Sequence, residues 1–387
     1  MSDDQDRIYL DHQATTPVDE RVMETMQPYF TETYGNAASN DHLYGVDAHQ
    51  AVDEARSTIA EALGAKSDEV IFTSGATESD NIAVFGVAER YENEGKHIIT
   101  CKTEHKAVLD PCKELEERGW EVTYLPVDEH GMIDLGDLRS AIREDTTLVS
   151  IMMANNEVGT IAPIREIGAI AREHGAKFHT DAAQCLGHIP IDVDEMNIDL
   201  MSASAHKCYG PKGIGMLYCR RSRPRVDVEP QIHGGGHERG LRSGTLNVPA
   251  IVGFGKSVEV GLEEMDEENE RFREWTDRMF NYLQEELGDV EQNGHPEKRL
   301  AHNLNVYIPG IESRALIVDL KETAIATGSA CTSADVEPSH VITAMHDEQR
   351  AHSSIRISVG RANGEEQVDE AAQRIAEAAE QLRAFAI

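Results

Sequence analysis

The sequence has few aromatic residues, few cysteines and no long hydrophobic run. Phe, Trp and Tyr make up 5% of its 387 residues, and there are six cysteines. The cysteines show no spacing typical of a metal site, and a chain of this length does not depend on disulfides. We therefore expect the protein to work in a reducing cellular compartment. No apolar run approaches the roughly 18 residues of a membrane span, and residues 1–7 are polar, unlike a secretory signal. The sequence therefore predicts a cytoplasmic protein without membrane attachment.

Basic residues are also scarce. The chain has 36 Lys and Arg against 70 Asp and Glu, a formal net charge of −34, and the acidic residues are spread along its whole length. Dense ions screen such repulsion and hydrated carboxylates keep a surface soluble. We interpret this composition as a halophilic surface, with an ordinary acidic cytosolic enzyme as the alternative. A field of this sign repels phosphate backbones, so nucleic acid is not an expected partner.

Short β-rich runs alternate with helical patterns through the first two thirds of the chain. Such alternation predicts an α/β fold with a mostly parallel sheet, whose ligands bind beyond the carboxyl ends of the strands. Helical patterns such as 106–118 and 164–174 are followed by Gly119 and Gly175, which suit helix C-terminal caps. We expect seven strands, at residues 70–73, 97–100, 122–125, 148–153, 177–180, 200–202 and 215–219.

The last third of the chain predicts a smaller α+β domain. Residues 252–287 have the pattern of one long amphipathic helix or a broken pair, which would connect the two domains. Strands are expected at 303–308, 324–326 and 354–358, and a final helix at 365–383. We expect a large domain of residues 14–255 and a small domain of residues 1–13 and 256–387.

Residues 73–79, with the sequence TSGATES, form one candidate binding segment. A strand end there would turn through Gly75 into a helix, whose amide groups and dipole can hold a phosphate, with the Thr77 hydroxyl as a further donor. Taken alone, the segment fits an ordinary Thr or Ser N-cap better.

Lys207 and Asp181 form a second candidate. Lys207 follows a buried strand and precedes a glycine-rich turn, where desolvation can prepare its amine for Schiff-base chemistry, although most lysines are surface charges. Asp181 also follows a strand and can hold the protonated nitrogen of pyridoxal phosphate, with a helix N-cap as the alternative. Taken together, the two residues favour pyridoxal-phosphate chemistry and these ordinary roles about equally.

All these segments together resemble the fold-type I pyridoxal-phosphate enzymes, and specifically the NifS/IscS cysteine desulfurases. The resemblance runs almost end to end. It is carried by residues 9–11 (YLD), 14–17 (ATTP), 74–79 (SGATES), 103–106 (TEHK), 155–159 (NNEVG), 234–238 (GGGHE) and 242–245 (RSGT), besides the segments of Asp181 and Lys207. It implies the fold-type I architecture and pyridoxal 5'-phosphate as cofactor.

The resemblance also implies residue roles. It places Ala76, Thr77, Ser204 and His206 at the cofactor phosphate, together with Thr245 from the other subunit of a homodimer. It implies that Ala205 and Asn156 are further cofactor-binding residues. It assigns Lys207 to covalent attachment, His105 to stacking and proton transfer, Asp181 to the ring nitrogen, Gln184 to the phenolic oxygen, and Asn156 with Arg356 to the substrate carboxylate. A guanidinium suits a carboxylate because it can donate two hydrogen bonds in parallel. The sequence departs from its relatives at two places. One is the pair His12-Gln13, and the other is Ala205, where relatives often carry glycine.

Residues 327–334, with the sequence TGSACTSA, separate this family from its pyridoxal relatives. Small residues around Cys331 would let its thiolate reach the substrate and then an acceptor. The other five cysteines are expected to be small buried hydrophobic residues. The loop resembles that of the branch that donates sulfur to scaffold proteins, and the resemblance implies that Cys331 can also be a shared iron-sulfur ligand with such a partner.

The implied reaction removes sulfur from L-cysteine and gives L-alanine and a Cys331 persulfide. An iron-sulfur scaffold protein of the IscU/NifU type would accept the sulfur, and tRNA thiolation is a further destination. The chain ends at Ile387 without the longer tail that relatives use for docking, so acceptor docking is expected to differ. The alternatives are a selenocysteine lyase, another class V aminotransferase, or a non-catalytic iron-sulfur assembly scaffold.

Overall fold

A seven-stranded sheet forms the centre of the computed structural model, which describes residues 7–327 and 338–385. The strand order is β2-β8-β7-β6-β5-β3-β4, and every strand is parallel to its neighbours except β8, which is antiparallel to both. The strands are β2 Val70–Thr73, β3 His97–Cys101, β4 Glu121–Leu125, β5 Thr146–Ser150, β6 Lys177–Asp181, β7 Leu200–Ser204 and β8 Gly215–Cys219. The expected α/β class and mostly parallel sheet are confirmed.

Helices cover both faces of this sheet because its strands are apolar on both sides. In β2, for example, Val70 and Phe72 belong to one core and Ile71 to the other. The core around Ile71 packs under α4 and α5, and the opposite core packs under α3, α6, α7 and the first half of α8. These helices are α3 Leu43–Ala62, α4 Ala76–Tyr91, α5 Lys106–Glu117, α6 Leu135–Ala141, α7 Ile164–Glu173 and α8 Val248–Leu287.

Local signals explain most of the element ends. Gly119 and Gly175 have φ values of +86° and +78° after α5 and α7, so both expected caps are confirmed. The fourth expected strand was placed too late, because β5 ends at Ser150 and the chain then bends toward the cavity described below. Near the N-terminus lie two short helices, α1 Glu20–Met26 and α2 Pro28–Thr31.

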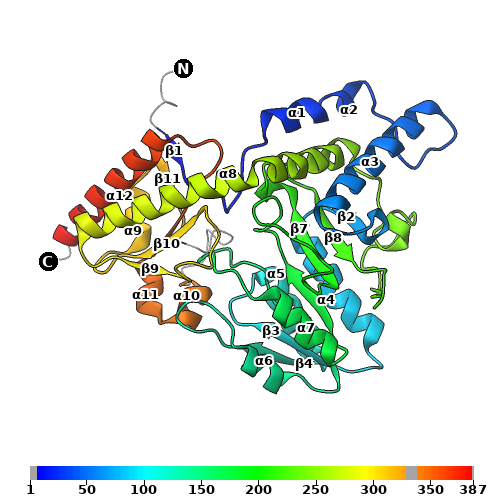
Figure 1. Cartoon of the computed structure of the whole chain (residues 1–387), viewed down its shortest axis with the longest axis horizontal. Coiled ribbons are helices and arrows are strands. Elements are labelled where there is room, and N and C mark those ends of the chain that lie inside the picture. The colour runs from blue at the N-terminus through cyan, green and yellow to red at the C-terminus, as the bar shows by residue number, and fades with distance from the viewer. Residues whose placement is uncertain (1–6, 328–337, 386–387) are drawn as a thin grey trace.

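The 40-residue helix α8 is continuous and joins two cores (Figure 1). Val258 belongs to the core under the large sheet, whereas Phe272 belongs to a second core at the other end of the molecule. The second core contains the three-stranded antiparallel sheet β12-β10-β9 and the final helix α12. The domain boundary between residues 255 and 256 would fall inside α8, and it stays a prediction.

The smaller part holds both the beginning and the end of the described chain. Residues near the N-terminus form β1, which pairs in parallel with β11. The expected strand at 324–326 is therefore shorter and shifted, because pairing with β1 fixes its position. The elements are β1 Ile8–Tyr9, β9 Glu291–Asn293, β10 Asn303–Tyr307, α9 Ser313–Asp319, β11 Thr323–Ala324, α10 His340–Met345, α11 Glu348–His352, β12 Ser354–Ser358 and α12 Glu365–Phe385.

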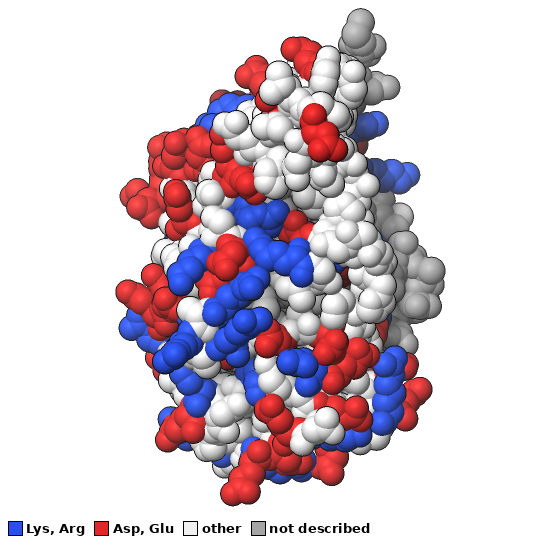
Figure 2. Space-filling view, turned by 90° about the vertical axis from the view of Figure 1, so that its right-hand side faces the viewer, with Lys and Arg blue, Asp and Glu red and all other residues white. Residues whose placement is uncertain are grey.

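The charged surface is mixed in sign. Figure 2 shows carboxylate side chains spread around one face, with Lys and Arg gathered across its middle. None of the helices within residues 7–327 and 338–385 is both long and apolar enough to cross a membrane. Adaptation to high salt stays a prediction, since it concerns behaviour in solution.

Three buried histidines, His12, His188 and His302, lie where the two parts of the chain meet. The His188 and His302 ring centroids are 4.6 Å apart. Burial lowers the pKa of all three and brings that of His12 to about 4. Each histidine therefore binds a proton less readily in the folded chain than in the unfolded chain.

We expect the free energy of unfolding to fall as the pH drops from about 6.5 toward 4, because the unfolded state then binds more protons. Replacing His302 with asparagine, which has no charged form, should flatten that acid limb, measured by urea denaturation at pH 7 and pH 5. The exposed His352→Asn is the matched control and should leave the slope unchanged. Equal slopes for all three proteins would contradict the prediction.

Candidate active site

Helix α4 begins without a side-chain cap. Its N-cap is Gly75, so the ordinary Thr or Ser cap favoured for this segment taken alone is wrong. The first amide groups of a helix have no partner within the helix, and the helix dipole makes that end positive. Glu78 at the third helical position reaches back to the Ser74 amide at 2.8 Å and pairs with Arg242, which closes the outer side of the turn. The start of α4 is thus prepared for an anion.

Strand β8 passes directly against this turn. A Cβ atom on Gly215 would lie 2.6 Å from the Gly75 Cα atom, so only glycine fits there. Gly75 has a φ of +156°, and a Cβ at that position would lie 3.7 Å from the Ser204 hydroxyl. The turn, Ser204 at the end of β7 and the start of α4 therefore surround one space.

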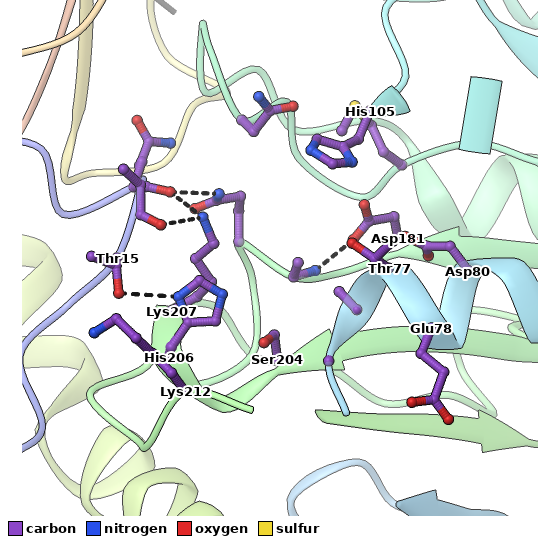
Figure 3. A pocket seen from close by; sticks show the side chains of 18 of the residues that line it. Thr15, Thr77, Glu78, Asp80, His105, Asp181, Ser204, His206, Lys207 and Lys212 are labelled. Atoms are coloured by element: carbon purple, nitrogen blue, oxygen red, sulfur yellow. Dashed lines mark hydrogen bonds between the residues drawn. The ribbon is translucent and has the colours of Figure 1, made fainter. Parts of the chain in front are cut away.

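Lys207 reaches the same space from a short 3-10 turn, Ala205–Lys207, that follows β7. Its Nζ atom donates hydrogen bonds to the backbone oxygens of Gln13 and Ala14, the second at 2.9 Å (Figure 3). The neighbouring His206 contacts the Thr15 hydroxyl through Nδ1 at 3.1 Å. The N-terminal segment thus holds the lysine amine at the cavity wall.

Asp181 is the last residue of β6 and is buried at 6% exposure. Its Oδ1 accepts the Ala183 amide at 2.8 Å, so it stabilises a turn rather than a helix N-terminus. Burial raises the pKa of Asp181, while the nearby His105 and Lys207 lower it. A cationic ring nitrogen would act in the same direction as those two groups and favour the carboxylate.

His105 is the N-cap of α5. Its Nδ1 accepts the Ala107 amide at 3.1 Å, which leaves the proton of the neutral ring on Nε2. The ring lies across the cavity from Lys207 in Figure 3. A stacked ring in this place can also pass a proton through Nε2.

Arg356 on β12 brings a guanidinium from the smaller part of the chain to the cavity. The residue is 2% exposed, and it donates to the Asn156 carbonyl oxygen and to Asp11 Oδ1, each at 2.7 Å. Asn156 also lines the cavity. The two residues are therefore close enough together to recognise one carboxylate.

The cavity has a volume of about 560 Å³. It brings together most of the residues expected from the sequence: Ala76, Thr77, His105, Asn156, Asp181, Gln184, Ser204, His206, Lys207 and Arg356. Ala205 is wholly buried, 2.8 Å from where a Gly210 Cβ would stand, and is not among the lining residues. Thr245 lines a neighbouring cavity with Ser74. Cys331 lies outside the described residues.

Several cavity features were not expected from the sequence. The carbonyl groups of Gln13 and Ala14 show no side-chain signal, so only the fold reveals them. Glu78 had a usable signal, because a glutamate three residues into a helix is typical of a capping box.

No cluster of three or more metal-binding side chains forms within the part of the chain that the structure describes.

The aminotransferase class-V family model matches residues 8–371. A curated relative, "Cysteine desulfurase IscS" of Anaeromyxobacter dehalogenans (strain 2CP-C), is 52% identical over 377 residues, 97% of this chain and 93% of the relative. A solved "NIFS-LIKE PROTEIN" has a TM-score of 0.89 and 39% identity over 96% of this chain and 98% of its own. The structure "SspA in complex with cysteine" has a TM-score of 0.78 and 38% identity over 91% and 98%.

A mostly parallel α/β sheet with a lysine, an aspartate and an uncapped helix start in one cavity defines a pyridoxal-phosphate enzyme of fold type I. The chain belongs to the aminotransferase class-V family, in its NifS/IscS cysteine desulfurase group.

Proposed function

We propose that this protein is a cysteine desulfurase that removes sulfur from L-cysteine, releases L-alanine and carries the sulfur as a persulfide on Cys331. The observation that carries the proposal is the convergence of three groups on one cavity: the start of α4, Lys207 and Asp181. These groups match the phosphate, the aldehyde and the ring nitrogen of pyridoxal phosphate. When bound, that cofactor accepts the electron pair left by removal of the substrate Cα proton.

The residues around the cofactor have separate tasks. The amides of Ala76 and Thr77, with the side chains of Ser204 and His206, hold the phosphate. Burial, followed by the nearby Lys207 and Lys212 charges, lowers the pKa of His206 to about 4, so this ring is neutral and can donate one hydrogen bond. Gln184 donates to the Gln13 carbonyl oxygen at 3.1 Å and lies where it can also meet the phenolic oxygen.

Substrate binding and proton transfer use the opposite side of the cavity. Arg356 and Asn156 bind the carboxylate of L-cysteine. The Lys207 amine removes the Cα proton and holds it at Nζ, and His105 Nε2 assists proton movement above the ring. The Cys331 thiolate then attacks the substrate sulfur. The Cβ–S bond breaks toward carbon, Cβ gains a proton, Cα regains the proton that Lys207 removed, and L-alanine leaves.

The other cysteines do not suit the thiol step. All five described cysteines are buried and free: Cys101, Cys112, Cys185, Cys208 and Cys219. Burial is the largest cause that raises the pKa of each, to about 11 for Cys208. The thiolate is the reactive form, so these side chains are poor nucleophiles. This supports Cys331, the sixth cysteine, as the sulfur carrier.

A homodimer would complete the site. Phe30 lies on α2, Tyr34 in the loop that follows it, and Leu43 and Tyr44 at the start of α3. All four are large side chains with much apolar surface, and each is more than half exposed. Exposed apolar patches of this kind favour burial against a partner. A second copy would cover them and supply Thr245 to the phosphate.

The released sulfur then passes to an acceptor, for which an iron-sulfur scaffold protein remains the expectation.

The function is tested by measuring alanine and sulfide formed from L-cysteine with dithiothreitol. Wild type should form both in equal amounts. Cys331→Ala should keep the cofactor absorbance but lose at least about 100-fold in turnover, because its nucleophile is gone. The matched control Cys112→Ala removes a buried thiol on α5 and should retain turnover. 3-Mercaptopyruvate without sulfide or alanine from the wild type would instead indicate an aminotransferase and overturn the proposal.

A further inference from the structure

Two more carboxyl groups lie near Asp181, and one of them, Asp80, also lines the cavity. Asp80 comes from α4 and Glu104 from the turn before α5, and both are 0% exposed. Helix α4 packs on β6, the strand that carries Asp181. Asp181 and Glu104 each disfavour the charged form of Asp80, and Asp181 does the same to Glu104. The three carboxyl groups therefore form one buried cluster, here called the carboxyl cluster.

The surroundings of Asp80 contain little that stabilises an anion. Neither oxygen accepts a hydrogen bond of ordinary geometry from the described residues, although the Ser202 hydroxyl is near enough to favour its charge. His179 Nε2 lies 3.6 Å from Asp80 Oδ1. That ring is no counter-ion, because burial lowers its pKa to about 3 and its nitrogens contact the Ser150 and Ser202 hydroxyls.

Glu104 is in a similar position. Its Oε1 accepts the Met152 amide at 2.7 Å, while Oε2 has no hydrogen-bond partner among the described residues. Burial is the main cause that raises the pKa of Asp80 and Glu104 well above the ordinary range. Lys207 is the cationic group that acts on the cluster, and it acts on Asp181. Three buried like charges without matching cations would be very costly, so only one carboxyl group can be ionised.

We propose that Asp80 and Glu104 are positioning residues that remain protonated and leave Asp181 as the only anion of the carboxyl cluster. Their uncharged side chains fill the space behind Asp181 and exclude water from it. A dry, fixed carboxylate pairs more strongly with a cationic ring nitrogen than a solvated one does. This inference rests on the proposed pyridoxal-phosphate chemistry, and it adds the role of two residues that act through Asp181.

The test uses the holoenzyme. It compares variants that keep the size of a side chain but remove its charge with variants that also remove its volume. Asp80→Asn and Glu104→Gln keep the size of each side chain but cannot ionise. If the native groups are protonated, both variants should keep turnover within about 3-fold. The midpoint of the cofactor absorbance titration, read without substrate, should stay within about 0.3 pH units of the wild type. Asp181→Asn removes the anion itself and should lose at least about 100-fold in turnover and shift the titration.

Asp80→Ala leaves room for water behind Asp181. It should lower kcat about 10-fold with little change in KM and move the titration midpoint by at least about 0.5 pH units, and the asparagine variant should restore both. An Asp80→Asn variant that behaves like Asp181→Asn would overturn the proposal, because the charge at residue 80 would then be needed. An Asp80→Ala variant that only unfolds more easily would also overturn it. Absence of desulfurase activity in the wild type affects the proposed function instead, since the absorbance titration needs no substrate.

Discussion

Lys207→Ala should lose covalent attachment of pyridoxal phosphate and at least about 10,000-fold in turnover. The loss is large because one amine both holds the cofactor and removes the substrate proton, and each task contributes orders of magnitude. In the structure this amine lies at the cavity wall, where the Gln13 and Ala14 carbonyl oxygens orient it. Borohydride reduction followed by mass spectrometry measures attachment, and alanine formation measures turnover.

Lys212→Ala is the matched control for this experiment. Lys212 is the other lysine among the residues that line the cavity, and it lies on the loop between β7 and β8. Its removal should leave the reducible link to Lys207 in place. A mass gain on another lysine in the wild type, or full turnover in Lys207→Ala, would contradict the assignment.

The sheet could be predicted from the sequence because its strands are buried on both faces. Continuous apolar runs such as 215–219 stand out between helical patterns, and their order alternates regularly. The antiparallel direction of β8 carries no comparable local signal, since it depends on pairing with β2 and β7. The continuity of α8 was left open, because the charged residues of its middle turns interrupt the apolar pattern between Gly261 and Phe272.

The site could be predicted where a motif joins neighbouring residues, as around Gly75 or Lys207. It was missed where contacts come from distant parts of the chain. Asp80 directly follows the recognised segment 73–79, yet only the packing of α4 on β6 shows that it approaches Asp181. The same holds for the cavity wall formed by Gln13. Its position depends on hydrogen bonds between the Thr16 hydroxyl and the backbone of the turn that follows β7.

Arg56 and Glu238 form a buried ion pair that ties the loop before Thr245 to the sheet. Arg56 Nη1 and Nη2 donate to the two Glu238 oxygens at 2.7 and 2.8 Å. Glu238 also accepts the Phe72 amide at 2.7 Å, and the guanidinium lies over the Phe72 ring. The exposed fractions of the two side chains are 8% and 1%. Each charge therefore relies on its partner in place of water.

Arg56→Met should lower the free energy of unfolding by about 3 to 5 kcal/mol, because it leaves the Glu238 carboxylate buried and unpaired. The double variant with Glu238→Gln should recover part of this loss, since an amide can still accept the Phe72 amide hydrogen bond without carrying a charge. The matched control is Arg143→Met, which breaks an exposed pair with Glu121 and should cost less than about 1 kcal/mol. Denaturant unfolding measures all three. A loss for Arg56→Met no larger than that of the control would show that water reaches Glu238, and the loop carrying Thr245 would then be held by other contacts.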